Sequence, residues 1–472
     1  MAQKATMQGG RRSIDPDKAI RSEASDMVNL SEAVLDWVAG TLGGRITRLD
    51  RAVARREAWL VDARRPDGTT IEAFLRIERD RHPDDPSSLA KEVAVLAALA
   101  RTDVPVPGVY GSSEALGVAL FERLRGRPDL PDAPVEQQRA VMRDFIAVVA
   151  RLHSLDPEVL GLEQLARPAT PAECALGEVD RLVRRHADFL ARGYDPLLRY
   201  GIAWLRRFVP ESVARVSLVQ GDTGPTNFMF EGDRVASVFD WEWAHFGDPI
   251  EDLGNIATRE FWNPSGGMAG LLDHYAAATG FAADRDRVRY YCVQQQIRGM
   301  IGIHRATVQA SPHEPITWYL AYRYIGDRAT CEAIADAMHV RLDAPDLPEE
   351  HDAADPLAEA AVHALNADIA PGTSGDLAAA RIRDVEIMIR CMDRVARYGR
   401  QVDDAERAEA EALLGIALPD VAAAAAALNR AIDAGGLDDA ALLRFLYRRA
   451  ARREWLYLPC TRLYPDRAWS PL

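Results

Sequence analysis

The chain has 472 residues, of which 48% are hydrophobic and 27% are charged, and its formal net charge at pH 7 is −14. This composition is typical of a globular protein with room for about three domains. The acidic charge repels polyanions, so the sequence argues against nucleic acid as a partner.

The first part of the chain alternates strand and helix patterns. A polar stretch over 1–28 precedes an amphipathic helix that is predicted to begin near Ser31. Residues 46–79 are predicted to form strands, with a turn at Pro66–Gly68 between two of them. A helix pattern over 89–101 follows, and two further apolar runs before residue 125 predict more strands.

Helix patterns dominate the remainder. Residues 125–339 are predicted to be mainly helical, with short strands over 213–240. Residues 340–355 are rich in Asp, Glu and Pro and are predicted to be a linker. Beyond it lie three helix patterns with Gly-Gly or Gly-Arg breaks between them, which predict a separate helical bundle over 356–472.

The cysteines and the N-terminus indicate the cellular compartment in which we expect the protein. The five cysteines are scattered and lack metal-site spacing, which is typical of reduced thiols inside a cell. The N-terminus lacks the apolar core of a secretory signal, and no stretch is apolar enough to predict a membrane span. We therefore expect a cytoplasmic protein with no membrane partner.

Chemistry-bearing residues gather in one stretch of the second half. Two apolar runs flank the turn EGDR and predict a hairpin in which Phe230 pairs with Val235. Such a hairpin would place Asn227 and Asp240 at the same end. Asp222 comes five residues before Asn227, in a loop with glycine and proline. Two carboxylates and one carboxamide are therefore expected at one rim.

These residue types suit phosphoryl transfer. Mg²⁺ takes hard oxygen ligands from one or two side chains when nucleotide phosphates and water supply the rest. A further carboxylate can accept the proton of an attacking hydroxyl. An Asp and an Asn five residues apart, followed by a second Asp, is the arrangement used in phosphoryl transfer.

The segments QGDTGPTN (220–227) and FDWEWAHFGDPIEDLG (239–254) resemble the signature of the aminoglycoside phosphotransferase and choline kinase superfamily. The resemblance covers roughly 30–335. It implies an α+β, two-lobed, protein-kinase-like fold, with a mainly antiparallel-sheet N-lobe and a mainly helical C-lobe. An all-α C-terminal domain then follows.

The resemblance also implies roles for individual residues. Asp222 would be the catalytic base, and Asn227 and Asp240 would be Mg²⁺ ligands. The chain departs from the family at Gln220, where a histidine is usual. We expect a modest effect, because glutamine can still donate and accept hydrogen bonds within the loop.

The N-lobe is expected to hold ATP, with GTP not excluded. The phosphoryl-transfer pattern needs a strand cation paired with a helix glutamate, and the candidates are Arg76 and Glu92. An arginine at this position resembles the branch related to domains fused to acyl-CoA dehydrogenases. The alternatives are a solvated strand charge and an ordinary surface glutamate. Backbone groups from Glu122 to Leu124 are expected to meet the adenine edge.

Other candidates carry weaker signals. The expected phosphate-covering loop lacks glycine, so Arg55 or Arg56 would either contact phosphate or belong to an exposed basic turn. Asp248 and Asp252 are expected to orient local structure, and Glu242 stays open for contact with metal or substrate. Four side chains on one helix pattern are assigned to its core in preference to an acceptor pocket: Tyr290, Tyr291, Arg298 and His304.

The sequence thus predicts five segments: a flexible N-terminus (1–28), a nucleotide-binding N-lobe (29–124), a catalytic and acceptor-binding C-lobe (125–339), a linker (340–355) and a helical bundle (356–472). The predicted function is ATP- and Mg²⁺-dependent phosphorylation of a small-molecule hydroxyl. The resemblance to the arginine-bearing branch favours a hydroxyacyl thioester or hydroxy-acid-like metabolite as the acceptor, and an aminoglycoside or choline-like amine stays open. The alternative is a nucleotide-binding, pseudokinase-like regulatory module. The helical bundle could mediate homo-oligomerisation.

Overall fold

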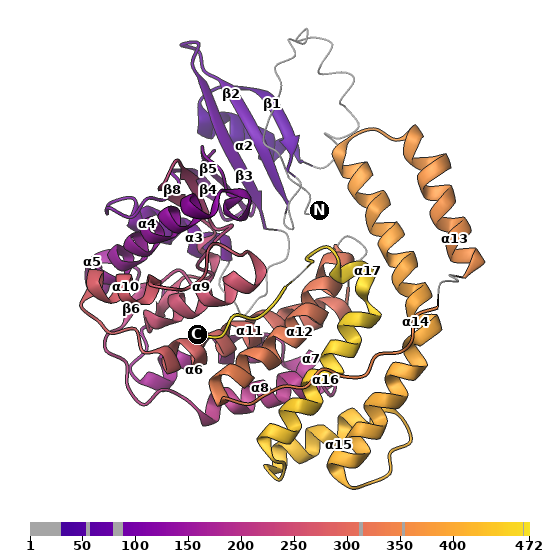
Figure 1. Cartoon of the computed structure of the whole chain (residues 1–472). Coiled ribbons are helices and arrows are strands. Elements are labelled where there is room, and N and C mark those ends of the chain that lie inside the picture. Colours follow the sequence, from indigo (N-terminus) through magenta and orange to yellow (C-terminus); the bar gives the residue numbers. More distant parts are fainter. Residues whose placement is uncertain (1–29, 53–56, 79–87, 311–314, 352–354, 466) are drawn as a thin grey trace. The chain divides into compact units, whose positions relative to one another are not determined.

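The structure is a computed structural model that describes residues 30–52, 57–78, 88–310, 315–351, 355–465 and 467–472 (Figure 1). The chain divides into two compact units. The first unit comprises the residues up to Gly126 together with Ser237–Glu242, and the second comprises Arg127–Ala236 and Trp243–Leu472. The N-terminal segment 1–28 that was expected to be flexible lies outside the described residues.

The first unit is built on a five-stranded antiparallel sheet with strand order β1-β2-β3-β5-β4. Its strands and helices are α2 (Glu32–Leu42), β1 (Arg45–Arg51), β2 (Ala58–Arg64), β3 (Thr70–Ile77), α3 (Ser88–Leu99), β4 (Val109–Ser113) and β5 (Val118–Glu122). The predicted strands and helices of this region are confirmed. The predicted turn also forms, with Gly68 at φ 83° after Asp67.

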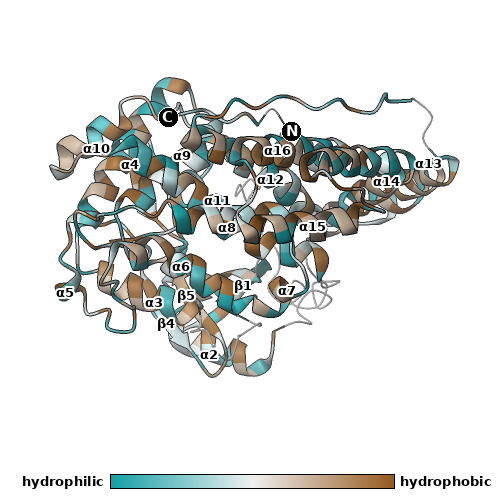
Figure 2. Cartoon of the chain, turned by 90° about the horizontal axis from the view of Figure 1, so that it is seen from below, coloured by the Kyte–Doolittle hydropathy of each residue, from teal (hydrophilic) through white to brown (hydrophobic). Residues whose placement is uncertain are grey.

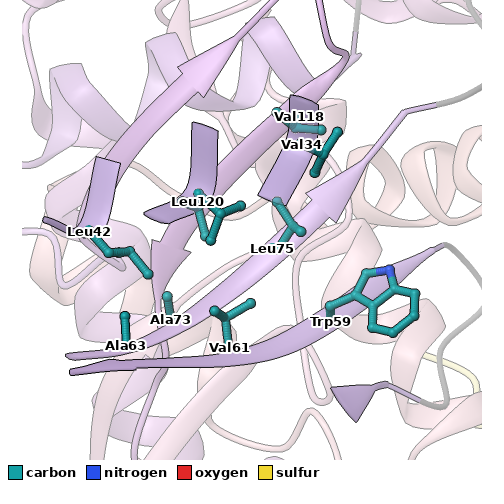
Figure 3. Close-up of a cluster of buried hydrophobic side chains, with 10 residues drawn as sticks. Val34, Leu42, Trp59, Val61, Ala63, Ala73, Leu75, Val118 and Leu120 are labelled. Carbon is teal, nitrogen blue, oxygen red and sulfur yellow. The ribbon is translucent and has the colours of Figure 1, made fainter. Parts of the chain in front are cut away.

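Helix α2 covers one face of this sheet because its ends and its apolar stripe are both specified. The Ser31 hydroxyl accepts a hydrogen bond from the Val34 backbone at the start, and Gly43 ends the helix at φ 65°. Its buried side chains pack on Val61 and Leu75 of the sheet (Figure 3). Each such aliphatic side chain contributes about 1.5–3 kcal/mol on burial.

The second unit is mainly helical, with short strands close to the predicted motif. Up to residue 339 it contains α4 (Val135–Ser154), α5 (Pro157–Leu160), α6 (Pro171–Arg185), α7 (Ala187–Ala191), α8 (Pro196–Arg207), β6 (Ser217–Val219), β7 (Phe228–Glu231), β9 (His245–Gly247), α9 (Ile250–Trp262), α10 (Leu271–Thr279), α11 (Arg285–Val308) and α12 (Ile316–Met338). Strand β6 pairs antiparallel with β9, and β7 pairs with β8 (Arg234–Val238). The short strands and the β7–β8 hairpin were therefore predicted correctly.

After residue 355 the chain forms α13 (Pro356–His363), α14 (Asp376–Leu414), α15 (Val421–Ala434), α16 (Asp439–Leu456) and α17 (Leu458–Thr461). The break expected at Gly399 is wrong, because α14 continues through it as one long helix (Figure 1). Tyr398 and Val402 are buried against Leu456 of α16. This packing outweighs the cost of about 1 kcal/mol for glycine within a helix.

The C-terminal helices are not a separate compact unit, although the sequence pattern suggested one. Helix α16 packs on α12, and α15 packs on α8. Asp195 caps α8 by accepting from the Leu197 backbone at 2.9 Å, and it also accepts from Arg449 of α16 at 2.7 and 2.9 Å. Arg449 in turn donates to Glu406 of α14 at 2.7 Å. Apolar spacing identified these helices but could not reveal which neighbour each one covers.

The long helices carry hydrophilic and hydrophobic residues together (Figure 2). In the described part of the chain, no helix has both the length and the apolar character needed to cross a membrane. The fold class predicted from the sequence is confirmed: an antiparallel sheet comes first, helices follow, and an all-helical region ends the chain.

Candidate active site

The loop between β6 and β7 fixes Asp222 and Asn227 against each other. The Asn227 amide nitrogen donates to the Asp222 carboxylate at 2.8 Å and to the Asp222 carbonyl at 2.7 Å. Because the nitrogen faces Asp222, the amide oxygen of Asn227 points the other way. Thr226, just before it, has φ 79°, a left-handed conformation that is costly for a β-branched residue. Such local strain is typical of functional loops.

Gln220 stabilises this loop through hydrogen bonds to its side chain. Its buried side-chain oxygen accepts from the backbone of Asp222 at 2.8 Å and from the Thr223 hydroxyl at 3.1 Å. The glutamine therefore supplies the hydrogen bonds within the loop that the sequence led us to expect of it. Its departure from the usual histidine does not leave the loop without support.

Replacing Gln220 by alanine should leave the partly buried backbone N–H of Asp222 without its acceptor. An unmet buried donor costs about 1–3 kcal/mol. We expect a lower melting temperature and roughly tenfold lower turnover, whereas Gln220→His should keep most of the activity because an imidazole nitrogen can accept the same bond. Thermal unfolding and steady-state kinetics measure the two effects. Equal activity in the alanine and histidine variants would contradict this role.

Asp252 holds the same loop from α9. It is fully buried and accepts from the backbone of Gln220 at 2.9 Å and of Gly221 at 3.0 Å. His153 contacts the same carboxylate at 3.0 Å. Burial alone would raise the pKa of Asp252, but the hydrogen bond and charge of His153, together with the hydrogen bonds from Thr223 and Gly221, outweigh it, and the pKa lies below its ordinary value. Asp252 thus orients the loop, as predicted.

Arg259 is the functional candidate that sequence reasoning missed. Its guanidinium lies 2.5 Å from the Asp222 carboxylate and donates to the Thr226 hydroxyl at 2.7 Å. The loop wraps closely around it, since a Cβ added at Gly224 would lie 2.9 Å from the Arg259 side chain. Arg259 lies seven residues after Asp252, two helical turns along α9, so both residues face the same loop. That spacing was the available signal.

Arg298 supports the loop from a third helix. It is buried in α11, donates to the Gly221 carbonyl at 2.6 Å and pairs with the buried Glu251. The remaining members of the α11 stripe are also buried and bond to other protein groups, which confirms that the stripe belongs to the core: Tyr290, Tyr291 and His304.

A second group of chemistry-bearing residues lies in the first unit. Arg76 of β3 is 2.6 Å from Glu92 of α3, 3.2 Å from Glu242 and 3.5 Å from Asp240. The Arg76 side chain is only 16% exposed, so it is not a solvated strand charge. Glu92 also accepts from the Trp241 backbone at 3.2 Å. The structure therefore brings together two predicted site residues, Arg76 and Glu92, with a third, Asp240.

Asp240 has an unusual backbone. Its φ is 62°, in the left-handed region that aspartate tolerates better than most residues. Its side chain is 31% exposed, whereas that of Glu242 is 3% exposed. Asp240 is therefore the more accessible of the two carboxylates, and the buried Glu242 pairs with Arg76.

The expected adenine-contacting segment lies at the end of β5. Glu122 is the last residue of the strand, and its backbone N–H donates to the Gly108 carbonyl at 2.7 Å. Leu124 lies beyond the strand. Contact of either residue with a nucleotide stays a prediction. Arg55 and Arg56 lie outside the described residues.

A metal ion at either group would need ligands beyond these side chains. Within the described ranges, no group of three or more His, Cys, Asp or Glu residues is arranged to hold one. The Asn227 amide oxygen and the Asp240 carboxylate are nevertheless hard oxygen donors of the kind that Mg²⁺ takes when phosphates and water complete its shell.

A comparison with protein families covers both groups. Residues 45–291, more than half of the chain, match the phosphotransferase enzyme family. The chain belongs to this family. The match includes the main candidate residues of this phosphotransferase described above: Arg76, Glu92, Asp222, Asn227, Asp240 and Arg259. The family predicted from the sequence is thereby confirmed.

Two curated relatives place the phosphotransferase in the predicted branch. It is 28% identical over 203 residues to acyl-CoA dehydrogenase family member 11 of Rattus norvegicus, covering 41% of this chain and 26% of the relative. It is 30% identical over 181 residues to the probable acyl-CoA dehydrogenase IBR3 of Arabidopsis thaliana, covering 34% and 22%. The alignments thus span about a quarter of these relatives.

Two solved structures to which the chain is similar can be named. Aminoglycoside phosphotransferase APH(4)-Ia, in a ternary complex with ADP and hygromycin B, is 18% identical with a TM-score of 0.45; the match covers 63% of this chain and 98% of that one. Macrolide 2′-phosphotransferase MphH from Brachybacterium faecium is 22% identical with a TM-score of 0.41, covering 68% and 100%.

Proposed function

We propose that this phosphotransferase transfers the terminal phosphoryl group of ATP to a hydroxyl of a small molecule, with Asp222 as the base. The observation that carries the proposal is the Asp222 carboxylate, which Asn227 holds at 2.8 Å in a loop fixed by Gln220 and Asp252. A carboxylate held in this way can accept a proton in a defined direction. The Asp222 side chain is 36% exposed, so a substrate can reach it.

In the proposed reaction, Asp222 accepts the hydroxyl proton as the acceptor oxygen bonds to the terminal phosphorus. The bond from that phosphorus to the bridging oxygen breaks, and ADP leaves with the electron pair. Asn227 and Arg259 hold the two Asp222 oxygens so that the base does not turn away from the acceptor. Correct orientation of this kind accounts for a large share of enzymatic rate enhancement.

For the nucleotide, we propose Arg76 as the phosphate-binding cation, oriented by Glu92 at 2.6 Å. Backbone groups from Glu122 to Leu124 are proposed to meet the base. Asn227 and Asp240 are each proposed as oxygen ligands of the Mg²⁺ that accompanies ATP. Bound Mg²⁺ neutralises phosphate charge.

Replacing Asp240 by alanine should weaken Mg²⁺-dependent nucleotide binding by about tenfold or more, because it removes a hard oxygen ligand. Calorimetric titration with ADP, in Mg²⁺ and in EDTA, measures this directly. The loss of ADP affinity should be seen when Mg²⁺ is present and should be small when EDTA has removed the metal. The exposed Asp103 is the matched control, and its alanine variant should bind like the wild type. If Asp240→Ala and the Asp103 alanine variant bound ADP equally well in Mg²⁺, Asp240 would not be a ligand of the metal.

The acceptor class is tested by ADP release from ATP across a panel of hydroxyacyl thioesters, simple hydroxy acids, choline and an aminoglycoside. The similarity to acyl-CoA dehydrogenase relatives favours hydroxyacyl thioesters. Acceptor-stimulated release that requires Mg²⁺ would support the proposal. Nucleotide binding without release for any acceptor would favour a regulatory module instead.

A further inference from the structure

The end of the chain returns to helices near the proposed base. We call residues 462–472, apart from 466, the C-terminal segment. Leu472 donates its backbone N–H to Asp336 of α12 at 3.2 Å, and Arg289 of α11 donates to the Leu472 carbonyl. Arg328 of α12 donates to the Arg467 carbonyl at 2.9 Å. These bonds fix the segment across α11 and α12, beyond the last of the C-terminal helices.

One side chain of the segment completes an aromatic group. Tyr464 lies with Trp262, at the end of α9, and with Tyr322 of α12, and we call these three residues the aromatic trio. Ring centroids are 5.8 Å apart for Trp262 and Tyr464, 5.4 Å for Trp262 and Tyr322, and 5.2 Å for the two tyrosines. The tyrosine hydroxyls are 2.7 Å apart. All three residues are only partly buried.

The trio lies next to the arginine that contacts the base. Arg259 and Trp262 are three residues apart on α9, so they share one face about 4.5 Å apart along the helix axis. Arg259 is 2.5 Å from the Asp222 carboxylate. Trp262 of the trio and the residue that contacts Asp222 therefore lie on the same face of α9, about one helical turn apart.

We propose that the aromatic trio and Arg259 recognise the acceptor, and that the C-terminal segment thereby contributes a specificity-determining residue, Tyr464. The inference rests on the proposed function of Asp222. Aromatic faces offer large apolar area, and the paired hydroxyls add a polar edge. Arg259 is paired with Asp222 and so holds the base beside this aromatic surface. The fitting acceptor is therefore a hydroxy compound with an extended apolar body, such as an acyl chain.

The role assigned here to the C-terminal helices differs from oligomerisation. Tyr464 follows these helices in the chain, and their packing places it against Trp262 of α9 and Tyr322 of α12. This gives the extension a function in acceptor recognition without a catalytic group of its own.

The test uses the full chain with two probes, hydroxybutyryl-coenzyme A and hydroxydecanoyl-coenzyme A. Binding is measured by calorimetry in the absence of ATP, and phosphorylation by ADP release. For Tyr464→Ala and Trp262→Ala we expect about tenfold weaker binding and a similarly raised KM for the longer probe. The effect on the shorter probe should be smaller, and the KM for ATP should be unchanged. Tyr464→Phe keeps the ring and should restore most of the affinity.

Phe208→Ala is the matched control, since Phe208 is 45% exposed and belongs to a different part of the second unit. Unchanged binding of the longer probe to both trio variants would overturn the inference, as would a wild-type preference for an aminoglycoside or choline over both probes. Binding that depends on Tyr464 without any phosphorylation would support the recognition role while contradicting the proposed reaction. Melting temperatures of Tyr464→Ala and Tyr464→Phe separate lost recognition from lost folding.

Discussion

Replacing Asp222 by asparagine should lower the turnover of acceptor phosphorylation by about a thousandfold, within the range of a positioned general base. The variant keeps the shape of the side chain but cannot accept the hydroxyl proton. Nucleotide affinity in Mg²⁺ should stay within about threefold, because Asp222 is not among the proposed nucleotide or metal ligands. Steady-state ADP release and calorimetric titration with ADP measure the two quantities separately.

Two further variants make this result specific. Asp233→Asn changes an exposed aspartate in the β7–β8 turn and should keep wild-type turnover. Asp222→Ala should be as inactive as Asp222→Asn, since both remove the base. Turnover above about a tenth of the wild type in either Asp222 variant would show that another group takes the proton.

Replacing Arg449 by methionine should lower the free energy of unfolding by about 3–5 kcal/mol, as expected when one partner of a buried ion pair is removed. The change leaves two carboxylates without their shared cation: Asp195, at 2.7 and 2.9 Å, and Glu406, at 2.7 Å. Both carboxylates are buried. Chemical denaturation followed by circular dichroism measures the loss.

Arg400→Met is the control for that variant, because Arg400 is a 95% exposed arginine on α14. Its removal should change stability by less than about 0.5 kcal/mol. A similar small loss for Arg449→Met would mean that the C-terminal helices are not held by this pair.

The same ion pair predicts a pH dependence. Burial alone would raise the pKa of Asp195, but Arg449 and its neighbours outweigh it and hold the pKa below its ordinary value. A carboxylate with a lowered folded-state pKa stabilises the fold above its unfolded pKa, near 3.9, and loses that contribution as the pH falls below it. Wild-type stability should therefore decline below about pH 4.

The sequence predicted the strands, most helices and the loop that carries Asp222, because these depend on local patterns. Turn residues and alternation mark the hairpin, and the spacing of Asp222 and Asn227 marks the loop. Arg259 was missed because its partner lies 37 residues earlier in the sequence, and only the fold brings them together. The same reason explains Tyr464, which meets Tyr322 across 142 residues.

Helix α14 shows the opposite case, in which a local signal for a helix end was present but tertiary packing outweighed it. Gly399 suggested an end to the helix, yet buried contacts of Tyr398 and Val402 on either side carry it through. Local propensity is worth about 1 kcal/mol at such a position, which is less than two buried side chains contribute.

The long-range partnership of Asp195 and Arg449 also has a consequence for synthesis on the ribosome. The two residues are 254 positions apart, so α8 emerges long before its partner has been translated. The sheet of the first unit and α2 draw their strands and helices from residues 32–122. Those parts can assemble early, whereas the second unit must wait for almost the whole chain. A nascent chain paused between α12 and α16 would expose a buried carboxylate and apolar helix faces, which makes that interval the one in which chaperone binding matters most.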